Sequence, residues 1–239
     1  MSPFEFDIHT HTIASGHHTR DTVTAMAKDA ARKGLKLLGI SEHGPALPQS
    51  CTLSYFRSLS YAPSMRMGVR LLYGAEANIL DASGRLDLPD EILARLDYCL
   101  AAMHLPCLAP GNMEENTKAC IRAMANPHVH AIAHPDDARY PLDYRRLVEA
   151  AIDFHVLLEI NNSSLSPNGY RGNARQNDRT ILELCRKRHY PILLSSDSHG
   201  CQNIGSFSYA LELIREVDFP MELVLNSSAR RLLRFLSQL

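Results

Sequence analysis

Short apolar segments alternate with amphipathic segments along almost the whole chain. Seven apolar runs predict β-strands, and several are almost continuously apolar, as strands buried on both faces are: residues 4–9, 35–40, 69–75, 96–103, 129–133, 156–161 and 191–196. Helices are predicted over residues 22–33, 112–126, 143–155, 178–189, 206–217 and 227–238. Residues 41–66 and 106–113 are predicted to be loops. This alternation of strand and helix predicts a parallel sheet joined by right-handed crossovers.

Residues that commonly bind metals recur where the predicted strands end. They are His9, His11, His17, His43, Glu76, His104, His134, Asp197 and His199. A single histidine after an apolar run is more often a structural residue than a metal ligand. Here, however, seven of the twelve histidines lie at the ends of predicted strands or in the loop after the first one, which a purely structural role does not explain. An open sheet would spread these residues along its edge, whereas a closed barrel gathers the carboxyl ends of its strands at one mouth. The sequence therefore predicts an α/β barrel with a metal centre at its mouth.

The type and number of these ligands favour more than one metal ion. Imidazole and carboxylate groups suit zinc, manganese or iron, and nine ligands exceed the needs of one tetrahedral ion. Glu76 is the best candidate for a bridge between ions, because a carboxylate has two oxygens to share. Asp7 shares a strand face with His9 and His11, and we expect it to hold a histidine in its tautomer and not to bind metal.

Composition narrows the class of protein. A length of 239 residues with 45% apolar residues fits a single domain over residues 1–239, built as one α/β barrel. A formal net charge of -1 gives no global attraction to nucleic acid or to an anionic membrane, and no apolar run is long enough to predict a membrane span. Six scattered cysteines without an export signal predict reduced thiols in a cytoplasmic protein. The sequence leaves open whether the protein forms a homo-oligomer.

The order of the ligands resembles that of a known family. The pattern H-x-H-x5-H, E-H-G, a lone Glu, a lone His, H-P and D-x-H runs from Asp7 to His199. It is similar to the PHP (polymerase and histidinol phosphatase) superfamily. Within that superfamily the chain looks like the short single-domain phosphatases with a three-metal centre, which the segments E-I-N-N from Glu159 and S-D-S-H from Ser196 support. The resemblance implies a distorted (β/α)7, TIM-like barrel with metals at its mouth.

The resemblance also implies a division of the ligands among three divalent ions, with zinc favoured over manganese or iron. The three implied sets are His9, His11, Glu76 and Asp197 for one ion, Glu76, His104 and His134 for a second, and His17, His43 and His199 for the third. Glu42 departs from the family pattern, in which Asp often precedes this histidine. We expect Glu42 to support the ligands and not to bind metal itself.

The predicted reaction is metal-dependent hydrolysis of phosphomonoesters of small molecules. A metal-activated water would be the nucleophile, so no side chain beyond the metal ligands is assigned a catalytic role. Phosphate also needs positive side chains, and the candidates near the predicted mouth are Arg20, Arg139, Arg171 and Arg175. Further candidates for substrate contact are His18, Asn161 and Asn162. Neither nucleic acid nor a membrane is an expected partner.

Three alternatives stay open. PHP domains also occur as exonuclease modules, so the chain could be a phosphodiesterase, although its balanced charge and the lack of a basic, aromatic stripe argue against this. An amidohydrolase-like barrel also opens with H-x-H, but it typically uses a metal-bridging lysine, and no lysine ends a predicted strand here. A non-catalytic metal-binding module is the third, although structural zinc sites usually close with four ligands and favour cysteine.

Overall fold

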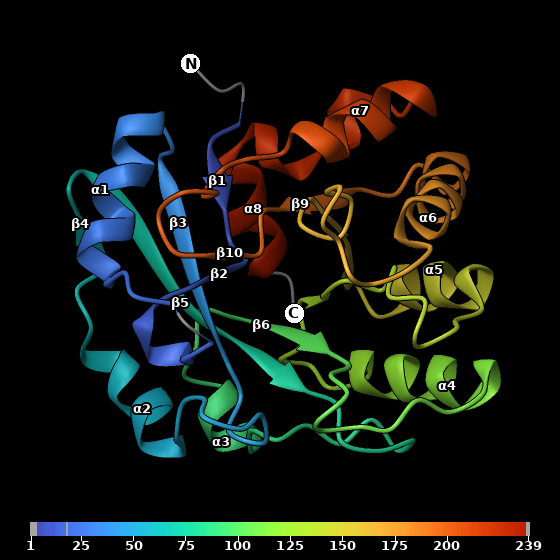
Figure 1. Ribbon diagram of the computed structural model, residues 1–239, viewed down its shortest axis with the longest axis horizontal. Coiled ribbons are helices and arrows are strands. Elements are labelled where there is room, and N and C mark those ends of the chain that lie inside the picture. The colour runs from blue at the N-terminus through green and yellow to red at the C-terminus, as the bar shows by residue number, and fades with distance from the viewer. Residues whose placement is uncertain (1–3, 18, 238–239) are drawn as a thin grey trace.

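The computed structural model describes residues 4–17 and 19–237, in which helices surround a central sheet (Figure 1). The strands are β1 (Phe6–Asp7), β2 (Thr10–His11), β3 (Leu37–His43), β4 (Met65–Arg66), β5 (Val69–Asn78), β6 (Tyr98–Ala102), β7 (Ala131–Ile132), β8 (Leu157–Asn161), β9 (Ile192–Ser195) and β10 (Ser198–His199). The α-helices are α1 (Val23–Lys33), α2 (Leu53–Ser58), α3 (Asp90–Leu93), α4 (Met113–Met124), α5 (Tyr144–Asp153), α6 (Ala174–Arg188), α7 (Ser208–Glu216) and α8 (Ala229–Leu236). Single 3-10 turns η1 to η4 lie at Ile13–Ser15, Leu59–Tyr61, Met221–Leu223 and Leu225–Ser227. None of the helices in these two ranges is long and apolar enough to cross a membrane.

Seven strands of the described chain form the wall of the barrel. Their order is β1, β3, β5, β6, β7, β8 and β9, and each neighbouring pair is parallel. Each of the predicted apolar runs overlaps one of these strands. On the outside of the wall, α1 packs against β3 and β5, α4 against β6 and β7, and α5 against β8. The structure confirms the predicted α/β, TIM-like barrel.

The seam between the first and last wall strands is closed by a short extra sheet and one side chain. At the mouth, β2 pairs in parallel with β10, so that His11 lies opposite His199. Further from the mouth, the amide of Asn226 accepts a hydrogen bond from Leu194 N at 2.8 Å and donates to the Leu194 carbonyl at 2.8 Å and the Phe6 carbonyl at 3.2 Å. Asn226 therefore supplies the partners that buried backbone groups at a sheet edge require.

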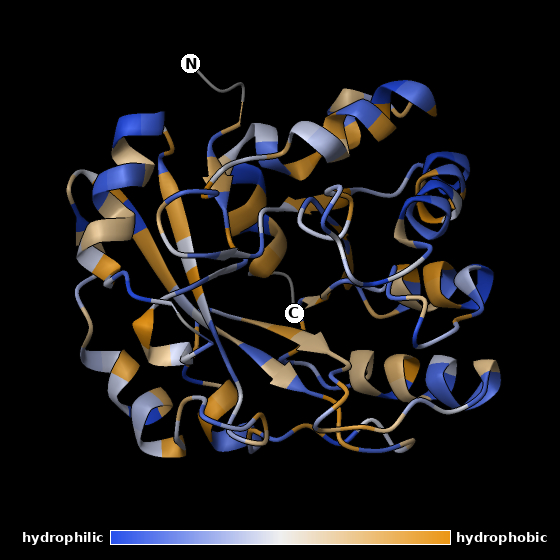
Figure 2. Cartoon of the chain, viewed as in Figure 1, coloured by the Kyte–Doolittle hydropathy of each residue, from blue (hydrophilic) through white to orange (hydrophobic). Residues whose placement is uncertain are grey.

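Apolar side chains pack in two regions, one inside the barrel and one between its wall and the helices. Figure 2 shows the largely apolar strands and the mixed composition of the surrounding helices. Leu232 and Phe235 of α8 join the apolar cluster inside the barrel. The Phe235 ring stacks on His155, two residues before the start of β8, with 3.9 Å between ring centroids. Helix α8 therefore closes the end of the barrel at which the strands begin.

Side chains that point into the barrel change from apolar to polar along a strand. In β5, Leu72 belongs to the interior cluster, and Glu76, which lies on the same face, is four residues nearer the mouth. In β8, Leu157 and Glu159 show the same change. The barrel thus carries an apolar half below and a polar half at the carboxyl ends of its strands.

Tyr98 fills the middle of the barrel. An added Cβ would lie 2.4 Å from its hydroxyl oxygen at Gly39 and 2.6 Å from its ring at Gly74, so both positions exclude a larger residue. The Tyr98 hydroxyl donates to the Ile8 carbonyl at 2.7 Å. This bonded ring helps to form a rigid floor beneath the polar half.

Two differences from the predicted elements concern the mouth. The segment 41–66, predicted to be a loop, contains α2, η2 and β4. Strands β3 and β5 are longer than predicted, so His43 and Glu76 lie within them and face each other in the parallel register. Because paired strands hold side chains more rigidly than loops do, these two residues are well fixed.

Candidate metal centre

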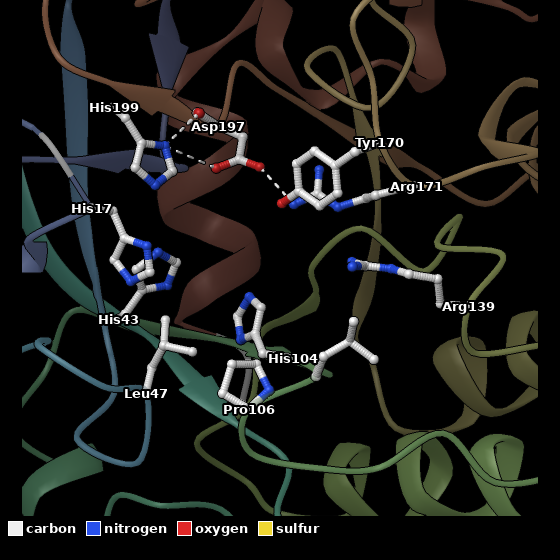
Figure 3. A pocket seen from close by; sticks show the side chains of 11 residues that line it. His17, His43, Leu47, His104, Pro106, Arg139, Tyr170, Arg171, Asp197 and His199 are labelled. Carbon is white, nitrogen blue, oxygen red and sulfur yellow. Dashed lines mark hydrogen bonds and ion pairs between the residues drawn. The ribbon is translucent and has the colours of Figure 1, made fainter.

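The nine residues predicted as metal ligands gather at the mouth of the barrel. A cavity of about 320 Å³ opens there, and its lining includes five of them: His17, His43, His104, Asp197 and His199 (Figure 3). The other four lie deeper and are buried: His9, His11, Glu76 and His134. These residues come from both ends of the chain and from most strands between them, and the closed barrel brings them together.

The carboxylate of Glu76 lies at the centre of the histidines. Its Oε1 atom faces three ring nitrogens: His134 Nε2 at 2.7 Å, His104 Nε2 at 3.3 Å and His9 Nε2 at 3.4 Å. Its Oε2 atom faces two others: His43 Nδ1 at 2.5 Å and His11 Nε2 at 3.6 Å. These five histidines belong to all three implied sets, so the Glu76 carboxylate lies where cations could share it.

Glu159 fixes the orientation of His9. A carboxylate can only accept, so His9 Nδ1 donates to Glu159 Oε1 at 2.6 Å, and His9 Nε2 is the ring nitrogen left to bind a cation. That Nε2 atom faces Glu76 and also Asp197, whose Oδ1 lies 3.6 Å away. The second oxygen of Glu159 accepts from His134 N at 2.6 Å. One buried carboxylate therefore positions two of the predicted ligands.

Ser15 and Glu42 orient His11. The Ser15 hydroxyl donates to Glu42, which leaves the Ser15 oxygen to accept from His11 Nδ1 at 3.2 Å. Glu42 also accepts from Thr12 N at 3.1 Å and from the Thr12 hydroxyl at 2.5 Å. Glu42 thus acts on His11 through Ser15, and the lone pair of His11 Nε2 points toward the centre.

Asn78 orients His104 in the same way. Its Nδ2 donates to Asp87 Oδ2 at 2.6 Å and to the Gly44 carbonyl at 3.2 Å, which fixes the direction of the amide. Its Oδ1 therefore accepts from His104 Nδ1 at 2.7 Å. His104 Nε2, the atom near Glu76, is therefore the ring nitrogen left to bind a cation.

Several buried atoms at the centre have no hydrogen-bond partner among the described residues: His9 Nε2, His11 Nε2, His43 Nδ1 and Glu76 Oε2. His43 Nδ1 and Glu76 Oε2 are close, but they do not meet in the geometry of a hydrogen bond. An unpaired buried polar group costs about 1–3 kcal/mol, so their gathering needs a reason. Convergent nitrogen and oxygen lone pairs are what divalent cations bind, and the residues present fit a metal centre.

Two carboxyl groups of the centre are held in their ionised form, although burial opposes it. Burial alone would raise the pKa of Glu76, but His104 and His9 hold it well below its usual value. Burial likewise opposes ionisation of Asp197, while His9 and Arg171 keep the pKa of Asp197 well below its usual value. Both groups can therefore offer a charged oxygen to a cation.

Two of the three implied ligand sets are compact. His9, His11 and Glu76 have ligand atoms within 4.8 Å of one another, and Asp197 Oδ1 lies 3.5 Å from His11 Nε2. His104 and His134 both face Glu76 Oε1, as the second set requires.

The third implied set is looser. In the part of the chain that the structure describes, His43 and His199 share a tight group with His11. The ring of His17 lies 4.9 Å from that of His43 and 6.2 Å from that of His199 between centroids, and its side chain is exposed.

Three of the nine predicted ligands, all of which the structure describes, adopt a left-handed backbone. The φ angles are 51° at His17, 31° at His134 and 51° at Asp197. Such a conformation costs a non-glycine residue roughly 1–3 kcal/mol. Five described residues that are not predicted ligands share it, namely Gln49, Met67, His155, His189 and Asp218, so the conformation by itself does not mark the site.

Arg171 is buried and bonded to a predicted ligand. Its Nη2 donates to Asp197 Oδ2 at 3.0 Å, and its Nη1 donates to the Ser164 hydroxyl at 2.9 Å. The guanidinium lines the cavity while it orients the Asp197 carboxylate.

The other three candidate arginines differ in position. Arg139 lines the cavity and pairs with Asp137. Arg175 pairs with Glu216 of α7 and is not among the residues that line this cavity. Arg20 is exposed and also does not line it. The structure therefore leaves Arg139 and Arg171 as the candidates for contact with a bound molecule.

Of the remaining candidates for substrate contact, Asn161 contacts a predicted ligand and Asn162 does not. Asn161 Nδ2 donates to Asp197 Oδ2 at 3.1 Å, so it belongs to the centre. Asn162 instead accepts from the backbone of Tyr209 at 2.9 Å and holds the start of α7. His18 lies outside the described residues.

The prediction that Asp7 holds a histidine ring is wrong. Its carboxylate accepts from the Ser196 hydroxyl at 2.5 Å and from Gly205 N at 2.8 Å. Phe6 and Ile8 belong to the cluster inside the barrel, so Asp7 between them points to the other side. It braces the segments that follow β9 and β10.

Sequence reasoning misses the side chains that orient the histidines: Glu159, Ser15 and Asn78. Glu159 carries a signal that could have been used, because a carboxylate at an inward position of an apolar strand is costly without a partner. Ser15 and Asn78 carry no comparable signal.

Known proteins are similar to this chain in sequence and in fold. The PHP domain model matches residues 7–214. A probable phosphatase of Clostridium novyi is 41% identical over 98% of this chain and 94% of its own length, and one of Acetivibrio thermocellus is 42% identical over 95% and 93%. The crystal structure of histidinol phosphate phosphatase from Lactococcus lactis, which contains zinc, L-histidinol and phosphate, has the same fold. The TM-score is 0.64 at 19% sequence identity, and the match covers 90% of this chain and 94% of that one. The relatives named phosphatases confirm the predicted class of enzyme, and the chain belongs to the PHP domain family.

Proposed function

We propose that this enzyme hydrolyses phosphomonoesters of small molecules at a centre of three divalent cations. The observation that supports the proposal most directly is the convergence of buried, unpaired ligand atoms from His9, His11, His43 and Glu76 at the described barrel mouth. They lie beside a cavity that two arginines also line. The names of the relatives, and the zinc in the histidinol phosphate phosphatase, support the reaction and the metals.

The proposed ligands are the nine predicted from the sequence. One cation would be held by His9, His11, Glu76 and Asp197, a second by Glu76, His104 and His134, and a third by His17, His43 and His199. Zinc suits the many imidazoles best, and manganese or iron would accept the same donors. Once bound, such cations supply an activated water and offset negative charge on the phosphate.

The chain's own residues prepare the site for this chemistry. Glu159, Ser15 and Asn78 hold the Nδ1 protons of three histidines, so the Nε2 atoms stay available. Arg171 keeps Asp197 in place from the side of the cavity. A cavity of about 320 Å³ suits a small molecule, which favours a small phosphomonoester over a nucleic acid.

The experiment combines metal analysis with turnover of two model substrates. We expect close to three ions per chain, and hydrolysis of p-nitrophenyl phosphate that is lost on chelation and restored by zinc or manganese. Preferential hydrolysis of bis(p-nitrophenyl) phosphate would indicate a phosphodiesterase instead. Hydrolysis of a cyclic amide without phosphatase activity would favour the amidohydrolase-like alternative, and full metal loading without any turnover would favour a non-catalytic module.

A further inference from the structure

The cavity has one wall that hydrolysis alone does not explain. Figure 3 shows His17 and His43 on one side, and Arg139 on the opposite side with its guanidinium directed into the cavity. Tyr170 lies beside Arg139. The apolar part of the lining consists of Leu47, Leu105 and Pro106.

Arg139 is fixed by its contacts without being saturated by them. Its Nε donates to Asp137 Oδ1 at 2.9 Å, and its Nη2 donates to Asp137 Oδ2 at 2.5 Å. Asp137 is buried and holds the guanidinium from behind, whereas the Arg139 side chain is 32% exposed. Within the described chain, Arg139 Nη1 makes no hydrogen bond. The guanidinium is therefore pre-organised to donate to an anion in the cavity.

Tyr170 joins Arg139 to the metal side of the cavity. Its ring centroid lies 5.0 Å from the guanidinium carbon of Arg139 and 5.1 Å from that of Arg171. Arg171 in turn donates to Asp197. In the series Asp197, Arg171, Tyr170 and Arg139, two side chains separate Arg139 from Asp197, so we expect Arg139 to face a part of the substrate other than the reacting phosphate.

The charge of the cavity indicates what this wall would bind. Apart from four histidines, the lining contains two arginines and a single carboxylate, Asp197, which is already paired with Arg171. An apolar group beside Arg139 would offer its free Nη1 no acceptor. The apolar residues of the lining could accept a carbon skeleton, and an anion is the group that Arg139 recognises best.

We propose that Arg139, held by Asp137 and Tyr170, binds a second anionic group, a carboxylate or a phosphate, on the alcohol part of the phosphomonoester. The proposal rests on the proposed phosphatase function. It makes Arg139 a specificity-determining residue, whereas Arg171 positions Asp197.

The experiment compares pairs of substrates that differ in the second anion. Glycerate 3-phosphate carries a carboxylate where glycerol 3-phosphate carries a hydroxymethyl group, and fructose 1,6-bisphosphate carries one more phosphate than fructose 6-phosphate. For at least one pair we expect the wild-type kcat/KM to favour the doubly anionic member by roughly tenfold or more. The pair that shows the preference identifies the anion. Arg139→Gln should bring that ratio close to one, and Arg139→Lys should give an intermediate ratio.

Arg146→Gln is the matched control, because Arg146 on α5 also pairs with a carboxylate, Glu114, but lies outside the cavity. It should change neither the ratio nor the basal turnover. Metal content and thermal stability are measured for each variant, so that a misfolded Arg139→Gln protein is recognised. If Arg139→Gln does not fold, the substrate ratio of Arg139→Lys tests the proposal in its place.

The outcomes separate the two proposals. A wild-type ratio near one for both pairs, or a ratio that survives Arg139→Gln, would overturn the anion subsite while hydrolysis stands. Failure of the metal-loaded enzyme to release phosphate from any of the four compounds and from p-nitrophenyl phosphate would overturn the proposed function, and the subsite with it.

Discussion

His9 Nδ1 and Glu159 Oε1 lie 2.6 Å apart, and neither side chain is exposed to solvent. The contact joins two residues that are 150 positions apart in the sequence. His9 lies between β1 and β2, and Glu159 lies in β8. Because Glu159 holds the Nδ1 proton, His9 presents Nε2 to the proposed cations. We therefore expect Glu159 to influence metal binding without being one of the proposed ligands.

Glu159→Gln should weaken metal binding by about 10- to 100-fold, the usual cost of losing a carboxylate that orients a ligand histidine. Glutamine keeps the shape of the side chain but removes the charge that holds the Nδ1 proton. Competition with a fluorescent zinc chelator measures the affinity. Glu212→Gln on the exposed face of α7 is the control, with no expected change. Unchanged affinity in Glu159→Gln would mean that other contacts position His9.

Glu76→Ala should have a larger effect, because both oxygens of Glu76 face histidines of the centre. We expect the loss of at least one ion per chain and a fall in kcat of roughly 100-fold or more, since a shared ligand and not only its support is removed. Elemental analysis and a phosphate-release assay measure both quantities. Glu91→Ala on α3, an exposed glutamate, is the control. A normal metal count with normal turnover would exclude a bridging role for Glu76.

The sequence predicts the barrel and the gathering of candidate ligands for a simple reason. Apolar runs reveal buried parallel strands, and the carboxyl ends of such strands meet at one mouth. His104 and His134 directly follow apolar runs, so their convergence could be expected before any coordinates were known. His43 and Glu76 were expected just past the ends of strands. They lie inside longer strands and are therefore held more rigidly than expected, and they still come together at the mouth.

The contacts that orient the ligands could not be predicted, because they depend on residues distant in sequence. Ser15 is one of many serines, and only the fold places it between Glu42 and His11. Asp7 illustrates a different limit. It was placed on the face of His9 by strand alternation, but β1 ends at Asp7 and residues 8–9 leave the regular strand, so the alternation stops there.

The seam of the barrel carries no sequence signal either, and it leads to a stability prediction. Asn226→Ala removes three hydrogen bonds to buried backbone groups of Phe6 and Leu194. We expect the free energy of unfolding to fall by roughly 2–3 kcal/mol, because buried donors and acceptors are left unpaired. Urea denaturation measures the change. Ser227→Ala next to it removes one local, partly buried bond and should cost less than about 1 kcal/mol. Equal costs for the two variants would contradict the role of Asn226 in the seam.

Asp178 of α6 is buried, and both of its carboxyl oxygens lack hydrogen-bond partners within the described ranges. Burial, and then the nearby carboxyl group of Asp136, raise the pKa of Asp178 well above its usual value of 3.8. Between these two pKa values the folded protein binds a proton that the unfolded chain has released. The free energy of unfolding therefore falls as the pH rises through that interval.

Asp178→Asn should raise the free energy of unfolding at high pH, and this gain should become smaller as the pH falls. Asparagine keeps the size of the side chain and removes the charge whose burial is unfavourable, so the gain should be about 1–3 kcal/mol at pH 8 and smaller at pH 5. Urea unfolding of chelator-treated protein at the two pH values measures the difference, and chelation keeps metal loss at low pH from contributing. Asp153→Asn at the exposed end of α5 is the control and should shift stability by less than about 0.5 kcal/mol at either pH. A gain at pH 5 that equals or exceeds the gain at pH 8 would show that Asp178 is not held protonated by its burial.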